Sequence, residues 1–236
     1  MSSTPPPFKI HDGTLEALKW LALVLMTGDH INTYLLGGKM PMLYAAGRMA
    51  FPLFAFVLAY NLARPGARAA YRRTAVRLTA FGAIAMVVFV APIFLGADWR
   101  PLNIMFTFLA ALAIIALLDG GGWTKRLAAL AVFLISGAFV DYFWPGLILL
   151  VSMYWFLRTG QAWALLVWMI ALVLALPLQS LLLYHAPLRY AGWTIGTLPL
   201  LALATRAAIR VPRTRWLFYV YYPVHLLAIW ALGVMS

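Results

Sequence analysis

Residues 15–36 read LEALKWLALVLMTGDHINTYLL, an apolar run long enough to cross a bilayer that still carries Glu16, Lys19, Asp29 and His30. Insertion scales put the cost of one charged side chain at the centre of a membrane helix at about 2.5–3.5 kcal/mol, so such residues are expected to face a partner or a cavity. Lys19 and His30 are eleven residues apart, close to three helical turns. They therefore share one face and lie about 16 Å apart along the axis. We interpret this face of the first membrane-spanning helix as one wall of a functional site.

The composition of the whole chain is that of an integral membrane protein. Of the 236 residues, 65% are hydrophobic and 10% are charged, and the mean hydropathy is +0.90. At about 20 residues per span, this length allows eight or nine spans and leaves no room for a sizeable soluble domain. We therefore predict an all-α fold, a polytopic helical bundle that forms a single transmembrane domain over residues 1–236. Residues 1–13 form a polar, proline-rich tail, which we expect to be retained because no small-residue cleavage site follows the first span.

Glycine and proline divide the apolar runs into about nine expected spans, with a range of eight to ten because some runs are short. The expected spans are residues 14–36, 44–62, 74–95, 102–118, 125–141, 145–158, 162–184, 191–206 and 214–234. The breaks between them are brief, and no repeat, linker or low-complexity tract interrupts the chain. This pattern indicates one compact bundle.

The basic residues predict how the bundle is oriented. The formal net charge is +12, but membrane proteins concentrate Lys and Arg at their cytoplasmic ends, so no nucleic-acid partner is required to explain it. With a cytoplasmic N-terminus, 14 of the 18 basic residues fall on the inner side, namely Lys9, Lys19, Arg64, Arg68, Arg72, Arg73, Arg77, Lys125, Arg126, Arg158, Arg206, Arg210, Arg213 and Arg215. The outer side keeps only Lys39, Arg48, Arg100 and Arg189. We predict that the N-terminus is cytoplasmic and the C-terminus is outside; one span fewer would place the C-terminus inside.

The residues available disfavour metal and thiol chemistry. The chain has no cysteine, which excludes disulfides, thiolate nucleophiles, iron–sulfur clusters and Cys-based zinc sites. Only four histidines are present, and no His/Glu spacing provides a ligand set. We therefore expect no metal site.

Asp29, His30 and Arg48 are the first candidates for a catalytic role. Imidazole is the side chain whose ordinary pKa suits proton transfer near neutral pH, and the adjacent carboxylate can orient the ring or balance its charge. Arg48 interrupts the second span in the same outer half of the membrane, so it can pair with Asp29 across neighbouring helices. Pro52 is expected to kink that span, which is tolerated where the backbone lines a cavity. The alternatives are a polar pair at the membrane interface for Asp29 and His30, and a snorkelling arginine for Arg48.

The last span supplies a second histidine. His225 lies about ten residues beyond the basic inner end of this span, so we expect it near the middle of the membrane. Tyr219, Tyr222 and His225 follow at intervals of three and share roughly one side of the helix. For Tyr219, a place in the aromatic belt at the membrane surface is the simpler alternative.

Three further polar residues have simpler structural explanations. Asp141 and His185 lie at predicted outer helix ends, where we interpret them as interfacial. Asn103 opens the fourth span and is expected to be its N-cap.

An arginine-rich segment, ARPGARAAYRRTAVRL at residues 63–78, leads into the third span. Arg73 and Arg77 are one turn apart on one face, and Arg72 flanks them. Guanidinium groups clustered in this way bind phosphates well, so a phosphorylated cosubstrate arriving from the cytoplasm is the expected ligand. The alternatives are topology determination alone, or binding of anionic lipid headgroups.

Three motifs resemble the TraX family, described as membrane-bound pilin N-acetylases of conjugative systems. They are ALKWLALVLMTGDHI at residues 17–31, GRMAFPLFAFVLAYNL at 47–62 and FYVYYPVHLL at 218–227, in the first two spans and the last. The order Lys-x10-His followed by an Arg-x3-Pro-Leu-Phe helix is also similar to the larger type-three membrane acyltransferases, which take an acyl group from cytoplasmic acyl-CoA and use a membrane histidine. Those enzymes carry an Arg-x-x-Arg pair near the third helix. Here Arg72, Arg73 and Arg77 have other spacings, so the arginine that contacts each CoA phosphate is left open.

The resemblance implies a membrane acetyltransferase of the bacterial inner membrane that uses acetyl-CoA and acts on a pilin N-terminal amine, with a polysaccharide or lipid hydroxyl as the alternative acceptor. It implies His30 as general base or transient acyl carrier. With the residue patterns above, the expected catalytic partners are Asp29, Arg48 and His225, and the expected acetyl-CoA contacts are Lys19, Arg72, Arg73, Arg77 and Tyr222. A small proton-coupled transporter and a non-catalytic pilus or secretion assembly subunit are the alternative functions. Membrane lipids and a second copy of the chain, which would help to wall a cavity, are further expected partners.

Overall fold

The computed structural model describes residues 6–90, 100–179 and 188–235, and this part of the chain is helical. The α-helices are α1 (Asp12–His30), α2 (Pro41–Gly47), α3 (Ala50–Ala63), α4 (Arg68–Phe89), α5 (Ile104–Gly120), α6 (Trp123–Ser136), α7 (Phe143–Thr159), α8 (Ala162–Gln179), α9 (Thr197–Ala204) and α10 (Leu217–Met235). A π-helix (Ile31–Leu35) continues α1, and a 3₁₀-helix (Leu188–Gly196) leads into α9. The all-α prediction is confirmed for these residues.

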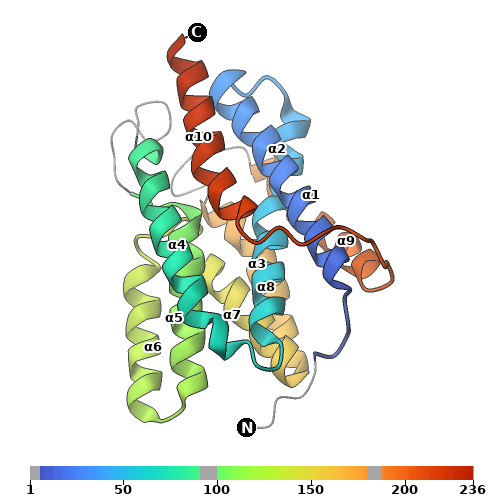
Figure 1. Ribbon diagram of the computed structural model, residues 1–236, viewed down its shortest axis with the longest axis vertical. Helices are drawn as coiled ribbons and strands as arrows, with labels where there is room; N and C mark the ends of the chain where they lie inside the picture. The colour runs from blue at the N-terminus through green and yellow to red at the C-terminus, as the bar shows by residue number, and fades with distance from the viewer. Residues whose placement is uncertain (1–5, 91–99, 180–187, 236) are drawn as a thin grey trace.

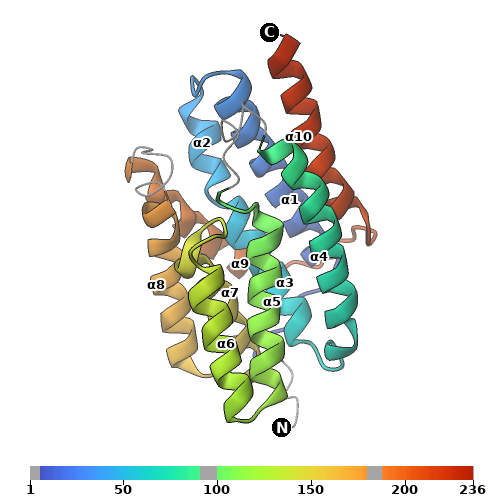
Figure 2. The same ribbon diagram turned by 90° about the vertical axis from the view of Figure 1, so that its left-hand side faces the viewer.

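The helices run roughly along the long axis of an elongated bundle (Figure 1). The last helix returns to the first: α10 packs against α4 and touches α1, and both views place it beside these two helices (Figures 1 and 2). On its other side, α1 packs against α2 and α3. The three motifs of the first two spans and the last are thereby brought into one part of the bundle.

Each expected span contains a helix, with differences at three places. The second span is divided, because α2 ends at Gly47 and α3 begins at Ala50. The break precedes Pro52, which has no N–H to give to an intrahelical hydrogen bond. The first span changes from α-helix to π-helix directly after His30, and the eighth begins as a 3₁₀-helix.

Two helical stretches among the described residues are long and apolar enough to cross a membrane, namely Pro41–Ala63 and Leu217–Met235. Three shorter apolar helices accompany them, at Ile104–Gly120, Ala162–Ala175 and Gly192–Ala204. The number of spans and the polytopic topology therefore remain predictions.

Large apolar side chains occupy both the core and much of the exterior. Fully buried Phe56, Tyr154 and Trp168 are among the largest residues of the core. On the exterior, Val87 of α4 is 76% exposed. Further exposed apolar residues are Ile84, Leu130, Leu134, Ile135, Leu166, Ile170, Val220, Val224 and Leu232, on α4, α6, α8 and α10.

The interpretation of Asn103 is confirmed. Its side chain accepts a hydrogen bond from the backbone N–H of Met105 at 3.1 Å, which caps α5. Its Nδ2 also donates to the carbonyl of Gly82 at 2.9 Å, so this buried residue ties α5 to α4.

Candidate functional site

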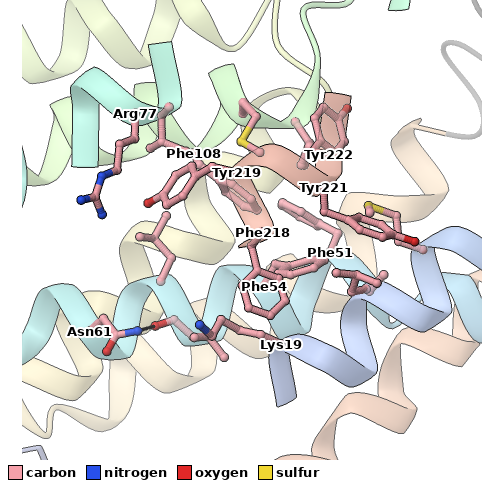
Figure 3. Close-up of a pocket in the computed structure, with 18 of the residues that line it drawn as sticks. Lys19, Phe51, Phe54, Asn61, Arg77, Phe108, Phe218, Tyr219, Tyr221 and Tyr222 are labelled. Atoms are coloured by element: carbon pink, nitrogen blue, oxygen red, sulfur yellow. Dashed lines mark hydrogen bonds between the residues drawn. The ribbon is translucent and has the colours of Figure 1, made fainter. Parts of the chain in front are cut away.

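A cavity of about 860 Å³ lies between α1, α3, α4 and α10. Its wall includes Phe51 and Phe54 from α3, and Phe218, Tyr219 and further tyrosines from α10 (Figure 3). Both Lys19 and His30 line it, so the cavity follows α1 for about three turns, as the shared face predicted.

The two ends of the cavity differ in chemistry. The end lined by Lys19 also holds a set of arginines, and we call it the arginine end. Arg64 directly follows α3, Arg73 and Arg77 lie on α4, and Arg213 and Arg215 precede α10. At the opposite end, which we call the histidine end, lie Asp29, His30, Arg48, Asp141, Tyr142 and Tyr222. Along α1, for example, Lys19 lines one end and His30 lines the other.

At the histidine end, the two histidines meet although they are 195 residues apart. Nδ1 of His30 lies 2.9 Å from Nε2 of His225, and the ring planes differ by 9°. Nδ1 of His225 in turn lies 3.0 Å from the carbonyl oxygen of Tyr221. His225 is buried behind His30 and is absent from the cavity wall, whereas Tyr222, predicted with it, lines the cavity.

These contacts determine the tautomers of the neutral pair. A carbonyl oxygen only accepts, so His225 must carry its proton on Nδ1, and its Nε2 is then an acceptor. His30 must therefore donate from Nδ1, which leaves its Nε2 unprotonated. His30, which lines the cavity, thus keeps one imidazole lone pair on Nε2 while its ring is held in place by a second imidazole.

Arg48 forms the predicted ion pair with Asp29 through its Nη2. Its Nε also donates to the carbonyl of Tyr44 at 3.2 Å, and the guanidinium lies 4.1 Å from the centre of the Tyr44 ring. The sequence suggested that Asp29 could orient His30, but the structure differs: Asp29 holds Arg48, and His225 orients His30. Adjacent helical residues point about 100° apart, so the side chains of Asp29 and His30 face different neighbours.

At the arginine end, the predicted cations are only partly brought together. Lys19, Arg73 and Arg77 line the cavity, but Arg72 is exposed and lies outside the lining. Lys19 is also paired with the buried carboxylate of Glu16 at 2.6 Å. The sequence patterns did not single out Arg64, which lines the arginine end of the cavity and pairs with Asp12. The hydrogen bond from Arg64 is the main cause that lowers the pKa of Asp12, which lies outside the predicted spans.

Several cavity residues were missed or interpreted differently from the sequence. Asp141, expected at an interface, lines the histidine end, and its carboxylate accepts from the backbone N–H of Tyr142 at 3.0 Å. Tyr221 contributes through its carbonyl, for which side-chain patterns give no signal; its hydroxyl lies 2.9 Å from that of Thr27. His185 lies outside the described residues. Within those residues, no group of three or more His, Cys, Asp or Glu side chains is arranged to hold a metal ion.

Comparison with known proteins gives one consistent family. The model of the family described as TraX protein matches residues 14–233. A protein TraX of Escherichia coli is 32% identical over 235 residues, which is 95% of this chain and 88% of that protein. A protein TraX of Escherichia coli strain K12 is 31% identical over 174 residues, covering 72% of this chain and 66% of that protein. No solved structure is significantly similar. The family model and the first relative each extend over nearly all of the sequence, and the chain therefore belongs to the TraX family.

Proposed function

We propose that this protein is a membrane-embedded acetyltransferase that moves an acetyl group from cytoplasmic acetyl-CoA to an acceptor amine, the N-terminus of a pilin. The observation that carries the proposal is the histidine pair at one end of a cavity whose other end is lined with arginines. One cavity thereby combines cations that can bind an anionic cosubstrate with an imidazole that can act as general base. Membership of the TraX family supports the choice of acceptor.

The cavity suits acetyl-CoA in size and charge. Ligand pockets commonly enclose about 300–1,000 Å³, and this one encloses about 860 Å³. The phosphates of the nucleotide would bind at the arginine end, where Arg73 and Arg77 line the wall. The pantetheine arm would extend along α1, where about 16 Å of helix separates Lys19 from His30, and would place the thioester at the histidine end.

The transfer step uses the free nitrogen of His30. The acceptor amine attacks the thioester carbonyl carbon while Nε2 of His30 takes one proton from the amine nitrogen. The C–N bond forms, the C–S bond breaks, and the proton passes from His30 to the departing CoA sulfur, so the base is regenerated. If transfer proceeds through an acetylimidazole, the same Nε2 is the nucleophile.

His225 and Arg48 would assist without taking up the proton. When His30 gains a proton at Nε2, its Nδ1–H remains bonded to His225, which keeps the ring in place. Arg48 is held by Asp29 and Tyr44 and lines the cavity, so its guanidinium can stabilise the oxyanion that develops on the carbonyl oxygen.

A membrane location is supported by the exterior of the bundle. Soluble monomers rarely expose contiguous apolar patches larger than a few hundred Å². Here α4, α6, α8 and α10 all expose large apolar side chains, for example Val87, Ile135 and Leu166. We propose that residues 1–236 form one multi-pass domain in the bacterial inner membrane, with about nine spans.

The alternative of a proton-coupled carrier is less well supported. A proton relay needs groups that can both accept and release a proton, and the hydrogen-bonded chain from His30 ends at the Tyr221 carbonyl. This arrangement orients a base but does not lead a proton across the bundle. Transport of protons in liposomes without acetyl-CoA would favour the carrier. The assembly-subunit alternative predicts that both histidines are replaceable.

The test is acetyl transfer by the purified protein to a pilin N-terminal peptide, followed by mass spectrometry. His30→Ala should reduce transfer by about 10²–10⁴-fold, the usual contribution of a general base, while thermal stability is retained. His225→Phe should lower kcat with little change in the KM for acetyl-CoA, and the double variant should be no worse than His30→Ala. The control is His11→Ala, because His11 is exposed and lies outside the cavity wall. Normal turnover by His30→Ala would refute the role of His30 as general base. Acetylation of a glycan instead of the peptide would show that the acceptor is a sugar hydroxyl and not the pilin amine.

A further inference from the structure

The segment of residues 205–216, which we call the strap, crosses from α9 to the start of α10 at the arginine end of the cavity. Arg213, Thr214 and Arg215 line the cavity there. Four arginines lie on the strap, and two of them, Arg206 and Arg210, are absent from the cavity wall. The strap therefore has a face toward the cavity and a face away from it.

The first turn of α1 holds the strap by side chains that do not line the cavity. Oγ1 of Thr14 donates to the carbonyl of Ala207 at 2.8 Å and accepts from the N–H of Ile209 at 3.1 Å. A Cβ at Gly13 would lie 2.8 Å from the backbone nitrogen of Val211, so a glycine is required for this close approach.

Glu16 makes the contact nearest to the cavity-lining part of the strap. Its Oε1 accepts from the backbone N–H of Thr214 at 3.0 Å and from the Thr214 hydroxyl, and its Oε2 pairs with Lys19 at 2.6 Å. Glu16 is only 2% exposed, so this carboxylate joins the strap to α1 in a buried place. Because Thr214 lies between Arg213 and Arg215, fixing its backbone holds the backbone of both arginines at the arginine end.

On the opposite side, α4 contacts the end of the strap. The guanidinium of Arg77 lies 4.2 Å from the centre of the Trp216 ring, and Trp216 is the last residue of the strap. The strap thus links α1 with α4 and brings Arg213 and Arg215 to the same cavity end as Arg73 and Arg77.

Four of the arginines gathered there form no ion pair with a carboxylate of the described residues. Among the described residues, Arg73, Arg77, Arg213 and Arg215 form no salt bridge, whereas Lys19 and Arg64 each do. Like charges brought together in this way repel one another, and an anion with several oxygens relieves that repulsion. The chemistry that fits is a phosphate-bearing group.

We propose that the strap is the specificity element for the phosphates of the cosubstrate: Arg213 and Arg215 bind them, and Glu16 is the positioning residue that holds these two arginines at the arginine end of the cavity. This inference rests on the proposed function and adds to it that the protein selects a nucleotide thioester over its phosphate-free counterpart. Phosphates of anionic lipids share this chemistry and are the competing source.

The experiment measures binding to the purified full chain in nanodiscs of phosphatidylcholine, with three probes: CoA, 3′-dephospho-CoA and pantetheine. The wild type should bind CoA most tightly and pantetheine most weakly. In a double variant, Arg213→Ala with Arg215→Ala, CoA should bind about 10- to 100-fold more weakly, as expected when charge-assisted hydrogen bonds are lost. Binding of pantetheine should not change.

The matched control is Arg206→Ala with Arg210→Ala, which removes two arginines of the same strap from outside the cavity and should leave binding of all three probes unchanged. Glu16→Gln keeps the size of the side chain but removes the charge that pairs with Lys19. It should weaken CoA binding and raise the KM for acetyl-CoA while kcat is retained. Thr214→Ala, which loses only the hydroxyl contact, should do the same to a smaller extent and guards against a folding defect in Glu16→Gln.

The outcomes separate the two proposals. If the wild type binds none of the three probes, both the proposed function and this inference are overturned. If the wild type prefers CoA and the Arg213/Arg215 variant keeps the full preference, the strap assignment alone is wrong. Repeating the measurement in phosphatidylglycerol nanodiscs tests the lipid: the strap assignment also fails if the variant alters binding of this lipid but not of CoA.

Discussion

Gly47 is the residue at which α2 lies directly against Asp29. A Cβ placed on Gly47 would lie 2.7 Å from Cγ of Asp29 and 3.0 Å from its Oδ2, the oxygen that pairs with Arg48. Real Cβ atoms do not approach other atoms so closely, so the carboxylate can reach Arg48 only because residue 47 has no side chain. The position of Arg48 at the histidine end therefore depends on a glycine that carries no chemistry itself.

This dependence predicts the effect of Gly47→Ala. The added methyl group should displace Asp29, separate it from Arg48 and lower stability by about 1–3 kcal/mol, the usual cost of overpacking. Acetyl transfer should fall with it. Gly28→Ala is the matched control, because the nearest atom to a Cβ there is Cδ2 of Leu43 at 3.5 Å, an ordinary contact. Both variants are compared with the wild type by thermal unfolding and by turnover. Wild-type values for Gly47→Ala would show that the Asp29–Arg48 pair does not depend on a glycine at position 47.

At this scale, the sequence predicted which residues carry charge inside the bundle but not all of their partners. His30 and Arg48 were recognisable because each interrupts an apolar run. The contact between His30 and His225 depends on how α10 lies against α1, a tertiary arrangement that no local pattern encodes. Arg72 was predicted with Arg73 and Arg77 from proximity in sequence alone, yet one helical step turns it away from the cavity.

At the scale of elements, hydropathy predicted the helices well because each needs a long apolar segment, and glycine or proline ends most of them. The π-helix Ile31–Leu35 was not predictable, since it depends on an altered hydrogen-bond register that leaves the composition unchanged. The expected spans 191–206 and 214–234 took in both ends of the strap and left only residues 207–213 as a loop between them. Its attachment to Thr14 and Glu16 joins residues more than 190 positions apart, so its part in the cavity emerged only from the structure.

Three helices, α4, α5 and α7, are joined by one carboxylate, Asp119 at the end of α5. Its Oδ2 accepts from the hydroxyls of Tyr154 at 2.7 Å and Tyr71 at 3.1 Å, and from Nε of Arg68 at 3.0 Å. Asp119 lies just beyond the predicted fourth span, residues 102–118. Burial raises its pKa, but the hydrogen bonds from Tyr154 and Arg68 outweigh burial and lower the pKa below 3.8.

The cluster predicts a destabilising effect of Asp119→Asn. The amide accepts weaker hydrogen bonds than the carboxylate, and stability should fall by about 1–3 kcal/mol, the cost of impairing buried partners. Because the pKa of Asp119 is lowered on folding, its contribution is complete above its ordinary value of 3.8 and is lost as the pH falls below it. Thermal unfolding against pH measures this. Asp12→Asn, at a mostly exposed ion pair with Arg64, should change stability little; an equal loss in both variants would exclude a special role for the cluster.

On the scale of the whole molecule, the direction of the first helix sets the direction of the cavity. Lys19 precedes His30 on α1, so a cytoplasmic N-terminus turns the arginine end toward the cytoplasm and the histidine end toward the opposite side. Acetyl-CoA is supplied from the cytoplasm, whereas a pilin N-terminus can be presented from the other side of the membrane. The proposed reaction therefore requires this orientation and would be impossible for acetyl-CoA in the inverted one.

The absence of cysteine makes this orientation directly measurable, because single cysteines can be introduced without a background. Thr124→Cys and Gln161→Cys, on exposed residues at predicted inner ends, should react with a membrane-impermeant maleimide only after the membrane is opened. Lys39→Cys and Met235→Cys, at predicted outer ends, should react in intact cells; Met235 is 83% exposed. If Lys39→Cys reacts only from the cytoplasmic side, the cavity has the opposite orientation, and the proposed supply of acetyl-CoA is refuted. Protection of Met235→Cys alone would contradict the placement of α10 in the cavity wall, because α10 begins at the arginine end and contacts His30 through His225, so α1 and α10 must end on the same side.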